Sequence, residues 1–143
     1  MKFFQKYNLL YFRFAILQRR HIQITTEYLG IITCPRKARA LCDLGYLSEA
    51  FDDSTKAILL SPTAEAYATR GLICLKQNQP RGAARDFEYA EKLDPREPKI
   101  YEYRAAGAFL EGRVSDACDD LERACRLGSC RPWENAQQNK VCR

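Results

Sequence analysis

Similar residues recur along this chain at a separation of 33 or 34 positions. Two prolines, Pro62 and Pro95, stand 33 residues apart. Small and apolar residues repeat with them, in the sets Ala38, Gly71 and Ala105; Ala50, Ala83 and Ala117; Ala57, Ala90 and Ala124; and Leu60, Leu93 and Leu127. A fixed period of this length is typical of solenoids built from repeated supersecondary units. The sequence therefore predicts three units, at 31–63, 64–97 and 98–131.

Each unit is predicted to contain two helices. In the middle unit, small and apolar residues recur at three- or four-residue spacing twice, first at Tyr67, Gly71 and Cys74 and then at Ala83, Phe87 and Ala90. Such spacing places them on one face of a helix. Between the two runs, Pro80 suits the first turn of the second helix, where its missing N–H has no partner to lose.

The turns between the predicted helices share their chemistry. Gly45, Asn78 and Gly112 occupy the same place in the three units, and each tolerates the left-handed conformation that closes a helix. The residue before Pro95 avoids the helical region, so a helix should end there. Pro98 then suits the first turn of the next helix.

The stretch "AEAYATRGLICLKQNQPRGAARDFEYAEKLDP" resembles a tetratricopeptide repeat, a pattern of about 34 residues with aromatic, small and alanine positions and a final proline. The third unit matches it but ends in "GSC" where the proline is expected. The first is weakest, because Cys34 and Ser54 stand where aromatic residues are usual. The resemblance implies an all-α fold, a right-handed α-solenoid of antiparallel helix pairs with a concave groove.

The two ends of the chain fall outside the repeats. Residues 132–143 are predicted to be a polar tail or a short cap, in which Pro132 begins a turn of helix and Trp133 covers Cys125 and Leu127. Three repeats are about the minimum for a stable array. The chain is therefore either capped at its ends or a fragment of a longer array.

Residues 1–30 form a basic, aromatic N-terminal segment with five Lys or Arg against one acid. Arg13 interrupts its apolar run, so the segment predicts neither a stable membrane span nor a secretory signal. Three interpretations stay open: a helix on the repeats or a poorly ordered tail, a mitochondrial presequence, and an interfacial membrane helix. We expect a cytoplasmic location, with mitochondrial targeting by residues 1–30 as the alternative.

The rest of the chain is nearly neutral, with 18 basic and 17 acidic residues, and does not predict nucleic-acid binding. The seven cysteines include no Cys-x-x-Cys, and the one histidine, His21, lies in the N-terminal segment, so no metal site is expected. We interpret the cysteines as reduced thiols of a cytosolic-type compartment rather than as disulfides. Cys118 and Cys125, seven apart on one helix face, are interpreted as buried small residues.

No catalytic set is evident in the sequence. The acidic pairs Asp52-Asp53 and Asp119-Asp120 are interpreted as solvated helix faces, because adjacent residues point in different directions. No glycine-rich phosphate loop is present. The sequence therefore predicts a non-enzymatic protein with no cofactor, no metal and no small-molecule substrate.

In the family that the chain resembles, the first helix of each pair lines the concave face and binds peptides. The resemblance implies a partner-binding groove formed by Arg36, Arg39, Thr69, Leu72, Lys76, Lys99, Tyr103 and Leu110, with Asp43, Glu65, Ala68, Glu102 and Ala106 beside them. Its charges would suit an extended or helical protein segment with an apolar anchor and a few acids. We expect an adaptor for a protein or peptide partner.

Some members of that family bind the acidic C-terminal tails of heat-shock chaperones with a clamp of lysine, asparagine and arginine. Only Lys99 stands at a matching place here, and Pro35, Arg39, Thr69 and Tyr103 occupy the others. The alternative function is a co-chaperone or assembly factor fragment, directed to an organelle or membrane by the N-terminal segment.

Overall fold

The computed structural model describes residues 35–143. Predictions for the N-terminal segment, including targeting, and for Cys34 lie outside the described residues. Within 35–143 all regular structure is helical: residues 35–43, α2 (Leu47–Leu60), α3 (Ala64–Lys76), α4 (Pro80–Leu93), α5 (Pro98–Leu110), α6 (Val114–Arg126) and α7 (Arg131–Gln138). The predicted all-α fold class is confirmed.

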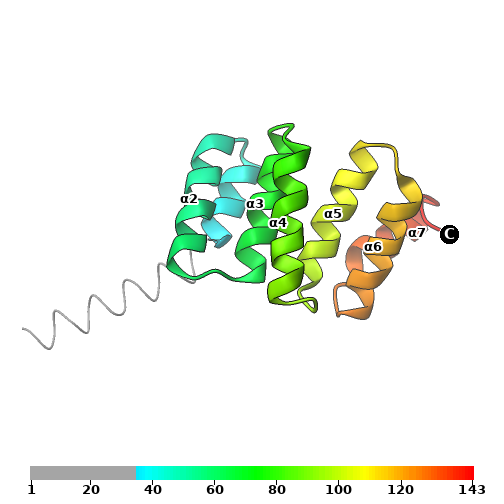
Figure 1. The fold of residues 1–143 in the computed structure, drawn as a ribbon. Helices are drawn as coiled ribbons and strands as arrows, with labels where there is room; N and C mark the ends of the chain where they lie inside the picture. The colour runs from blue at the N-terminus through cyan, green and yellow to red at the C-terminus, as the bar shows by residue number, and fades with distance from the viewer. Residues whose placement is uncertain (1–34) are drawn as a thin grey trace, which may run out of the picture. The chain divides into compact units, whose positions relative to one another are not determined.

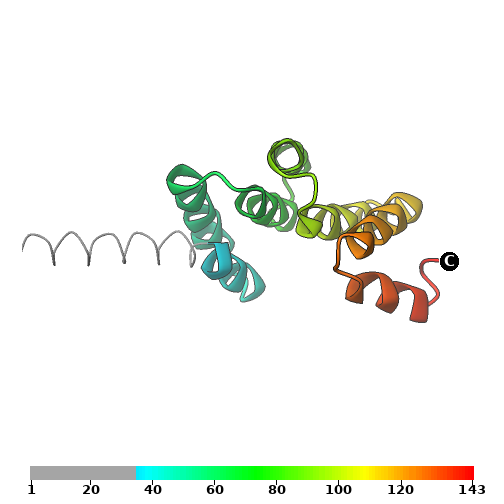
Figure 2. The same cartoon turned by 90° about the horizontal axis from the view of Figure 1, so that it is seen from below.

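Successive helices of the described part run antiparallel and stand in a row from α2 to α7 (Figure 1). α3 packs most extensively against α4, and α5 against α6. α3 also packs against α5, which joins one helix pair to the next, and the view from below shows α4 standing out of the line of α3 and α5 (Figure 2). The prediction of stacked antiparallel helix pairs is confirmed, whereas the unit bounds 31–63, 64–97 and 98–131 stay a prediction.

The predicted turn chemistry accounts for the helix ends. Gly45, Asn78 and Gly112 adopt the left-handed conformation, with φ of 88°, 59° and 74°. α4 ends at its C-cap Asp94, and α5 begins with Pro98 in its first turn. These local predictions from the sequence are confirmed.

Small residues let the two helices of a pair approach closely. Ala50, Ala83 and Ala117, which recur on the second helices, are at most 1% exposed. Gly71 of α3 faces the ring of Phe87 on α4, and a Cβ atom at Gly71 would lie 2.7 Å from that ring. The close contact explains why this position of the middle pair carries glycine.

The first helix pair fills its core differently from the other two. Ser54 of α2 stands where Phe87 and Leu121 stand in later pairs, and it is fully buried with its hydroxyl donating to the Phe51 carbonyl at 2.8 Å. Phe51 itself packs against the apolar clusters of the first and middle pairs. The aromatic ring that is missing at Ser54 is thus supplied from three residues earlier on the same helix.

An ion pair joins the first helix to the second in each of these helix pairs. The pairs are Lys37 with Asp53 at 2.6 Å, Arg70 with Asp86 at 2.7 Å, and Arg104 with Asp120 at 2.6 Å. The interpretation of Asp53 and Asp120 as solvated is wrong, because their side chains are only 14% and 13% exposed. Each lies against the cation of the facing helix, whereas the adjacent Asp52 and Asp119 are exposed.

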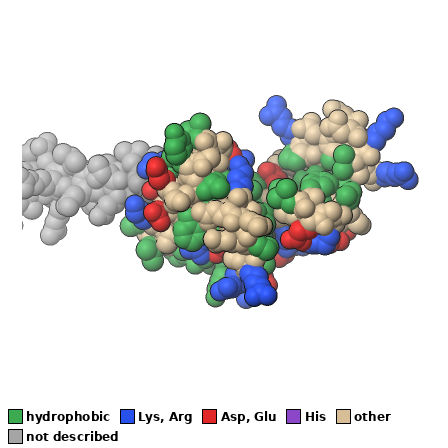
Figure 3. Space-filling model, turned by 90° about the horizontal axis from the view of Figure 1, so that it is seen from above, with side chains coloured by type: hydrophobic (Ala, Val, Ile, Leu, Met, Phe, Trp, Pro, Cys, Tyr) green, Lys and Arg blue, Asp and Glu red, His purple; other side chains and the backbone are tan. Residues whose placement is uncertain are grey.

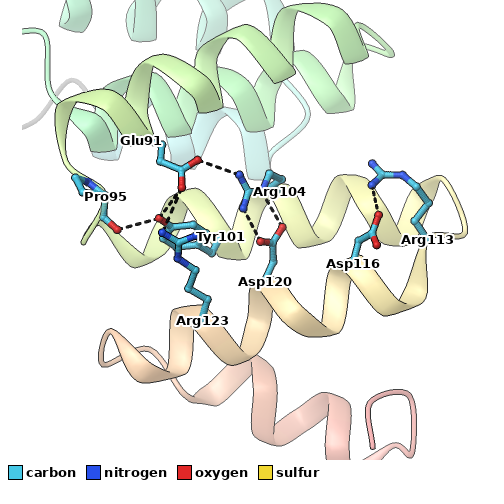
Figure 4. Close-up of polar contacts among 8 residues, drawn as sticks. All are labelled: Glu91, Pro95, Tyr101, Arg104, Arg113, Asp116, Asp120 and Arg123. Carbon is cyan, nitrogen blue, oxygen red and sulfur yellow. Dashed lines mark hydrogen bonds and ion pairs between the residues drawn. The ribbon is translucent and has the colours of Figure 1, made fainter.

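A polar network joins α4, α5 and α6 (Figure 4). The Tyr101 hydroxyl donates to the Pro95 carbonyl at 2.9 Å and lies 3.1 Å from the Glu91 carboxylate. Arg104 donates to the other oxygen of Glu91 at 3.2 Å. Arg123 lies 3.3 Å from the same carboxylate, and its guanidinium carbon lies 4.2 Å from the centre of the Tyr101 ring. The network fixes the α4–α5 turn against the third helix pair.

The Arg70–Asp86 pair provides a stability prediction. Asp86→Ala leaves the guanidinium of Arg70, whose side chain is only 21% exposed, without its bidentate partner. We expect a loss of about 2–3 kcal/mol in the free energy of unfolding, measured by urea denaturation.

The controls separate a lost partner from a lost interaction. Arg70→Met combined with Asp86→Ala should be less destabilising than Asp86→Ala alone, since no uncompensated charge remains. Asp116→Ala removes an exposed partner of Arg113 and should leave the urea midpoint nearly unchanged. A double variant no more stable than Asp86→Ala would contradict this account.

Candidate partner-binding face

The residues predicted for the groove come from helical residues 35–43, α3 and α5, and they differ in accessibility. Arg36, Lys76 and Leu110 are exposed, and Arg39 and Lys99 are half-buried. Thr69, Leu72 and Tyr103 are buried, with 2%, 7% and 7% of their surface exposed. A partner could therefore reach the first five directly, and the other three only if their neighbours moved.

Arg39 and Tyr103 make a contact that spans from the first helix pair to the third. A guanidinium nitrogen of Arg39 donates to the Tyr103 hydroxyl, and the guanidinium carbon lies 4.9 Å from the centre of the ring. Arg39 also donates through Nε to Asp43 at 3.0 Å. Tyr103 is thereby buried in the same apolar cluster as Leu72. This contact covers part of the predicted groove from within the chain.

Three further contacts join neighbouring helix pairs on the candidate face. Lys99 of α5 forms an ion pair with Glu65 of α3. Lys76 of α3 approaches Asp43 at 3.6 Å and bonds the Cys42 carbonyl at 3.4 Å. Two of the acidic residues that sequence reasoning set beside the groove, Asp43 and Glu65, are thus partners of its cations, whereas Glu102 accepts a hydrogen bond from Ser129.

Burial and charge act in opposite directions on the ionisable groups of this face. Burial raises the pKa of Tyr103, although the charges of Arg39 and Lys99 partly oppose the shift. Burial alone would lower the pKa of Lys99, but the hydrogen bond and charge of Glu65 outweigh it and raise the pKa. At neutral pH the face therefore holds a protonated Tyr103 and a charged Lys99.

A largely apolar cavity of about 470 Å³ lies between α5, α6 and α7. Its wall includes Glu102 and Ala106, which sequence reasoning placed beside the groove, and Asn135 and Asn139 from the end of the chain. Sequence reasoning missed the two asparagines because the segment after residue 131 has no counterpart in the repeats. The three- and four-residue spacing of Pro132, Asn135 and Asn139 was the available signal.

α7 forms a cap, but not on the expected residues. Trp133 and Ala136 pack against the cluster that contains Ala105, Ala117 and Leu121, rather than covering Cys125 and Leu127. Leu127 instead packs against the cluster of the middle pair. The cap therefore lies on the apolar surface between α5 and α6.

The expectation that the cysteines are reduced is wrong for four of them. Two disulfides join Cys118 to Cys142 and Cys125 to Cys130. The chain reverses at Gly128, with φ of 102°, and at Lys140, with φ of 57°, which returns Cys130 and Cys142 to α6. Cys118 and Cys125 are also only half-buried, so the prediction that they are buried small residues is wrong. Cys42 and Cys74 are free and buried.

Charged side chains are dispersed on the face drawn in Figure 3, where Lys and Arg project at several separate places with Asp and Glu among them. Within residues 35–143, no cluster of His, Cys, Asp and Glu is suited to hold a metal ion. None of the helices in that range has the length and apolar content needed to cross a membrane.

The stacked helix pairs define the chain as an α-solenoid repeat protein. No family model matches the chain. It is similar to the first TPR domain of the human RPAP3 protein, solved by NMR, with a TM-score of 0.65 at 21% identity over 78% of this chain and 88% of that one.

Two curated relatives are similar to part of this chain. The TPR repeat-containing thioredoxin TDX of Arabidopsis thaliana is 35% identical over 92 residues, which are 64% of this chain and 24% of the relative. A DnaJ homolog subfamily C member 7 homolog of Dictyostelium discoideum is 40% identical over 60 residues, 41% of this chain and 11% of the relative. The chain thus spans a quarter or less of these relatives. Its helix pairs are repeats of the tetratricopeptide kind.

The buried Tyr103 predicts a stability change at alkaline pH. Its pKa in the folded protein lies above the unfolded value of about 10, so its contribution is complete below about pH 10 and is lost as pH rises through the folded pKa. As pH rises above about 10, wild type should lose more unfolding free energy than Tyr103→Phe, measured by urea denaturation at each pH.

Tyr101, whose pKa is also raised by burial and by Glu91, gives an independent comparison. The double variant Tyr101→Phe/Tyr103→Phe should show the shallowest alkaline loss of the series. Equal pH profiles for wild type and Tyr103→Phe would show that burial does not hold the Tyr103 proton.

Proposed function

We propose that this protein is a non-enzymatic adaptor that holds a segment of a partner protein along the face formed by residues 35–43, α3 and α5. The observation that carries the proposal is the convergence of Arg39, Lys76 and Lys99 on one face of the array through their contacts with Tyr103, Asp43 and Glu65. The partner is an acidic peptide segment with an apolar anchor.

The charge balance of the face supports an acidic partner. Arg39 and Lys76 share one carboxylate, that of Asp43. The Asp43 contact of Lys76 is 3.6 Å long and exposed on both sides, so water screens it and a partner carboxylate can replace it. Arg36 adds an exposed cation on the same helix as Arg39. This end of the face therefore attracts negative charge.

Apolar surface for an anchor is available at the other end of the face. Leu110 is 77% exposed at the end of α5. The cavity beside Ala106 and Phe109 adds an apolar depression on the same helix. A peptide that places its acids near Arg36 and its apolar residue near α5 would use both features.

A co-chaperone or assembly factor is the second candidate, and similarity to the Dictyostelium DnaJ homolog supports it. The geometry favours it less, because Lys99, the cation expected to bind a terminal carboxylate, is already paired with Glu65. For the adaptor we propose a cytoplasmic site of action, and for the second candidate an organelle or membrane surface.

Peptide selection tests the proposal without assuming a partner. Short random peptides displayed on phage are selected on the purified full chain, and the selected sequences are measured by fluorescence anisotropy. We expect acidic peptides with an apolar anchor, and we expect Arg36→Glu/Lys76→Glu to weaken their binding by about tenfold or more.

The matched control is Arg81→Glu/Arg85→Glu, which makes the same charge change on α4, a helix outside the predicted face. It should leave the affinity within about twofold of wild type. Equal effects of the two variants would place the binding elsewhere. A peptide ending in Glu-Glu-Val-Asp tests the second candidate: micromolar binding that Lys99→Ala abolishes would favour chaperone-tail recognition over the proposed segment.

A further inference from the structure

The last helix of the chain has few contacts of its own. α7 has eight residues, none of them fully buried. Its apolar contacts come from Trp133 and Ala136, which rest half-buried on the cluster between α5 and α6. A helix this short is marginal in water by itself, so its position depends on what attaches it to the array.

A disulfide supplies that attachment. Cys118 lies on α6, and Cys142 follows α7, 24 residues later. Cys142 is 3% exposed, and its N–H donates to the Ala136 carbonyl of α7 at 3.2 Å. The bond therefore closes a loop that contains the whole of α7 and returns the end of that loop to the helix on which α7 rests. Closing such a loop disfavours the released state by reducing its chain entropy.

The second disulfide cannot have the same effect. Cys125 and Cys130 are five residues apart and lie at the end of α6 and at the N-cap of α7. Their bond closes only the turn before α7, so breaking it leaves the other end of α7 attached. The two bonds thus form a natural pair of test and control.

We propose that the Cys118–Cys142 disulfide is a redox-controlled latch that holds α7 against α5 and α6. With the bond formed, α7 covers the cluster containing Ala105, Ala108 and Leu121 and forms one wall of the 470 Å³ cavity. With the bond reduced, residues 131–143 detach and this apolar surface opens. The inference does not depend on the peptide-binding proposal.

The chemistry is thiol–disulfide exchange with a dithiol reductant. A thiolate of the reductant attacks Sγ of Cys118, which is half-buried and more accessible than the buried Cys142, and the Cys142 thiolate leaves. The second thiol of the reductant resolves the mixed disulfide. Two electrons pass to the protein, two protons complete the cysteine thiols, and the reductant becomes a disulfide. A low-molecular-weight disulfide such as oxidised glutathione reverses the exchange.

Trp133 reports the position of α7 directly, because it is the only tryptophan in the chain. Acrylamide quenching of its fluorescence is measured on the full chain before and after reduction with dithiothreitol. We expect reduction to raise the quenching constant roughly twofold as the side chain leaves its cluster, and Cys142→Ser to show the raised value without reductant.

The matched control is Cys125→Ser/Cys130→Ser, which should keep the low quenching constant until dithiothreitol is added. Hydrogen exchange monitors folding in the same samples: residues 131–138 should lose protection on reduction while α3 keeps it. Equal quenching in oxidised wild type, reduced wild type and Cys142→Ser would overturn the latch. So would a control variant that already behaves like Cys142→Ser, or a Cys118–Cys142 bond that does not re-form with oxidised glutathione.

Discussion

The close approach of two helices at small residues is the constraint on which the array depends. Ala50, Ala83 and Ala117 are essentially inaccessible, and Gly71 leaves no room for a Cβ beside Phe87. At this separation the facing side chains interdigitate, so each pair gains dispersion contacts that a wider spacing would lose. α3 also packs against α5, so each pair provides the surface that its neighbour buries. The 33- or 34-residue period of the sequence arises because each helix pair packs in this same way.

The recurring ion pair acts within the same constraint. In the middle and third pairs an arginine lies 16 residues before the aspartate that it meets on the facing helix, and in the first pair a lysine takes its place. Bidentate geometry at Arg70 and Arg104 fixes the rotation of one helix against the other as well as their distance. Lys37 is more exposed, at 64%, and meets Asp53 through a compact ammonium rather than a planar fork, so it offers less orientation. The relative orientation of the two helices is thus least constrained in the first pair. The same pair also has Ser54 where the other two have a large apolar residue.

Local chemistry made the fold predictable, whereas the state of the candidate face depended on contacts between distant residues. Gly45, Asn78 and Gly112 could be assigned to helix ends from their backbone preferences alone. The burial of Thr69 and Leu72 could not, because it follows from packing across helix pairs, of which the Arg39–Tyr103 contact over 64 residues is one part. The disulfides escaped prediction for a similar reason. Cys142 meets Cys118 only through the chain reversal at Lys140, a residue with no special preference for a left-handed backbone.

The contacts of the candidate face also determine how a partner would have to bind. Arg39, Lys76 and Lys99 are already paired within the chain, so an acidic segment gains only the difference between its own carboxylates and those of Asp43 and Glu65. That difference is small at Arg39, which both Asp43 and Tyr103 hold, and larger at the long, exposed Lys76–Asp43 contact. Recognition should therefore begin at the exposed cations, with Tyr103 and Leu72 remaining part of the core. In the proposed complex Tyr103 would hold Arg39 in place, and we expect specificity to depend on the exposed residues at the rim of the face.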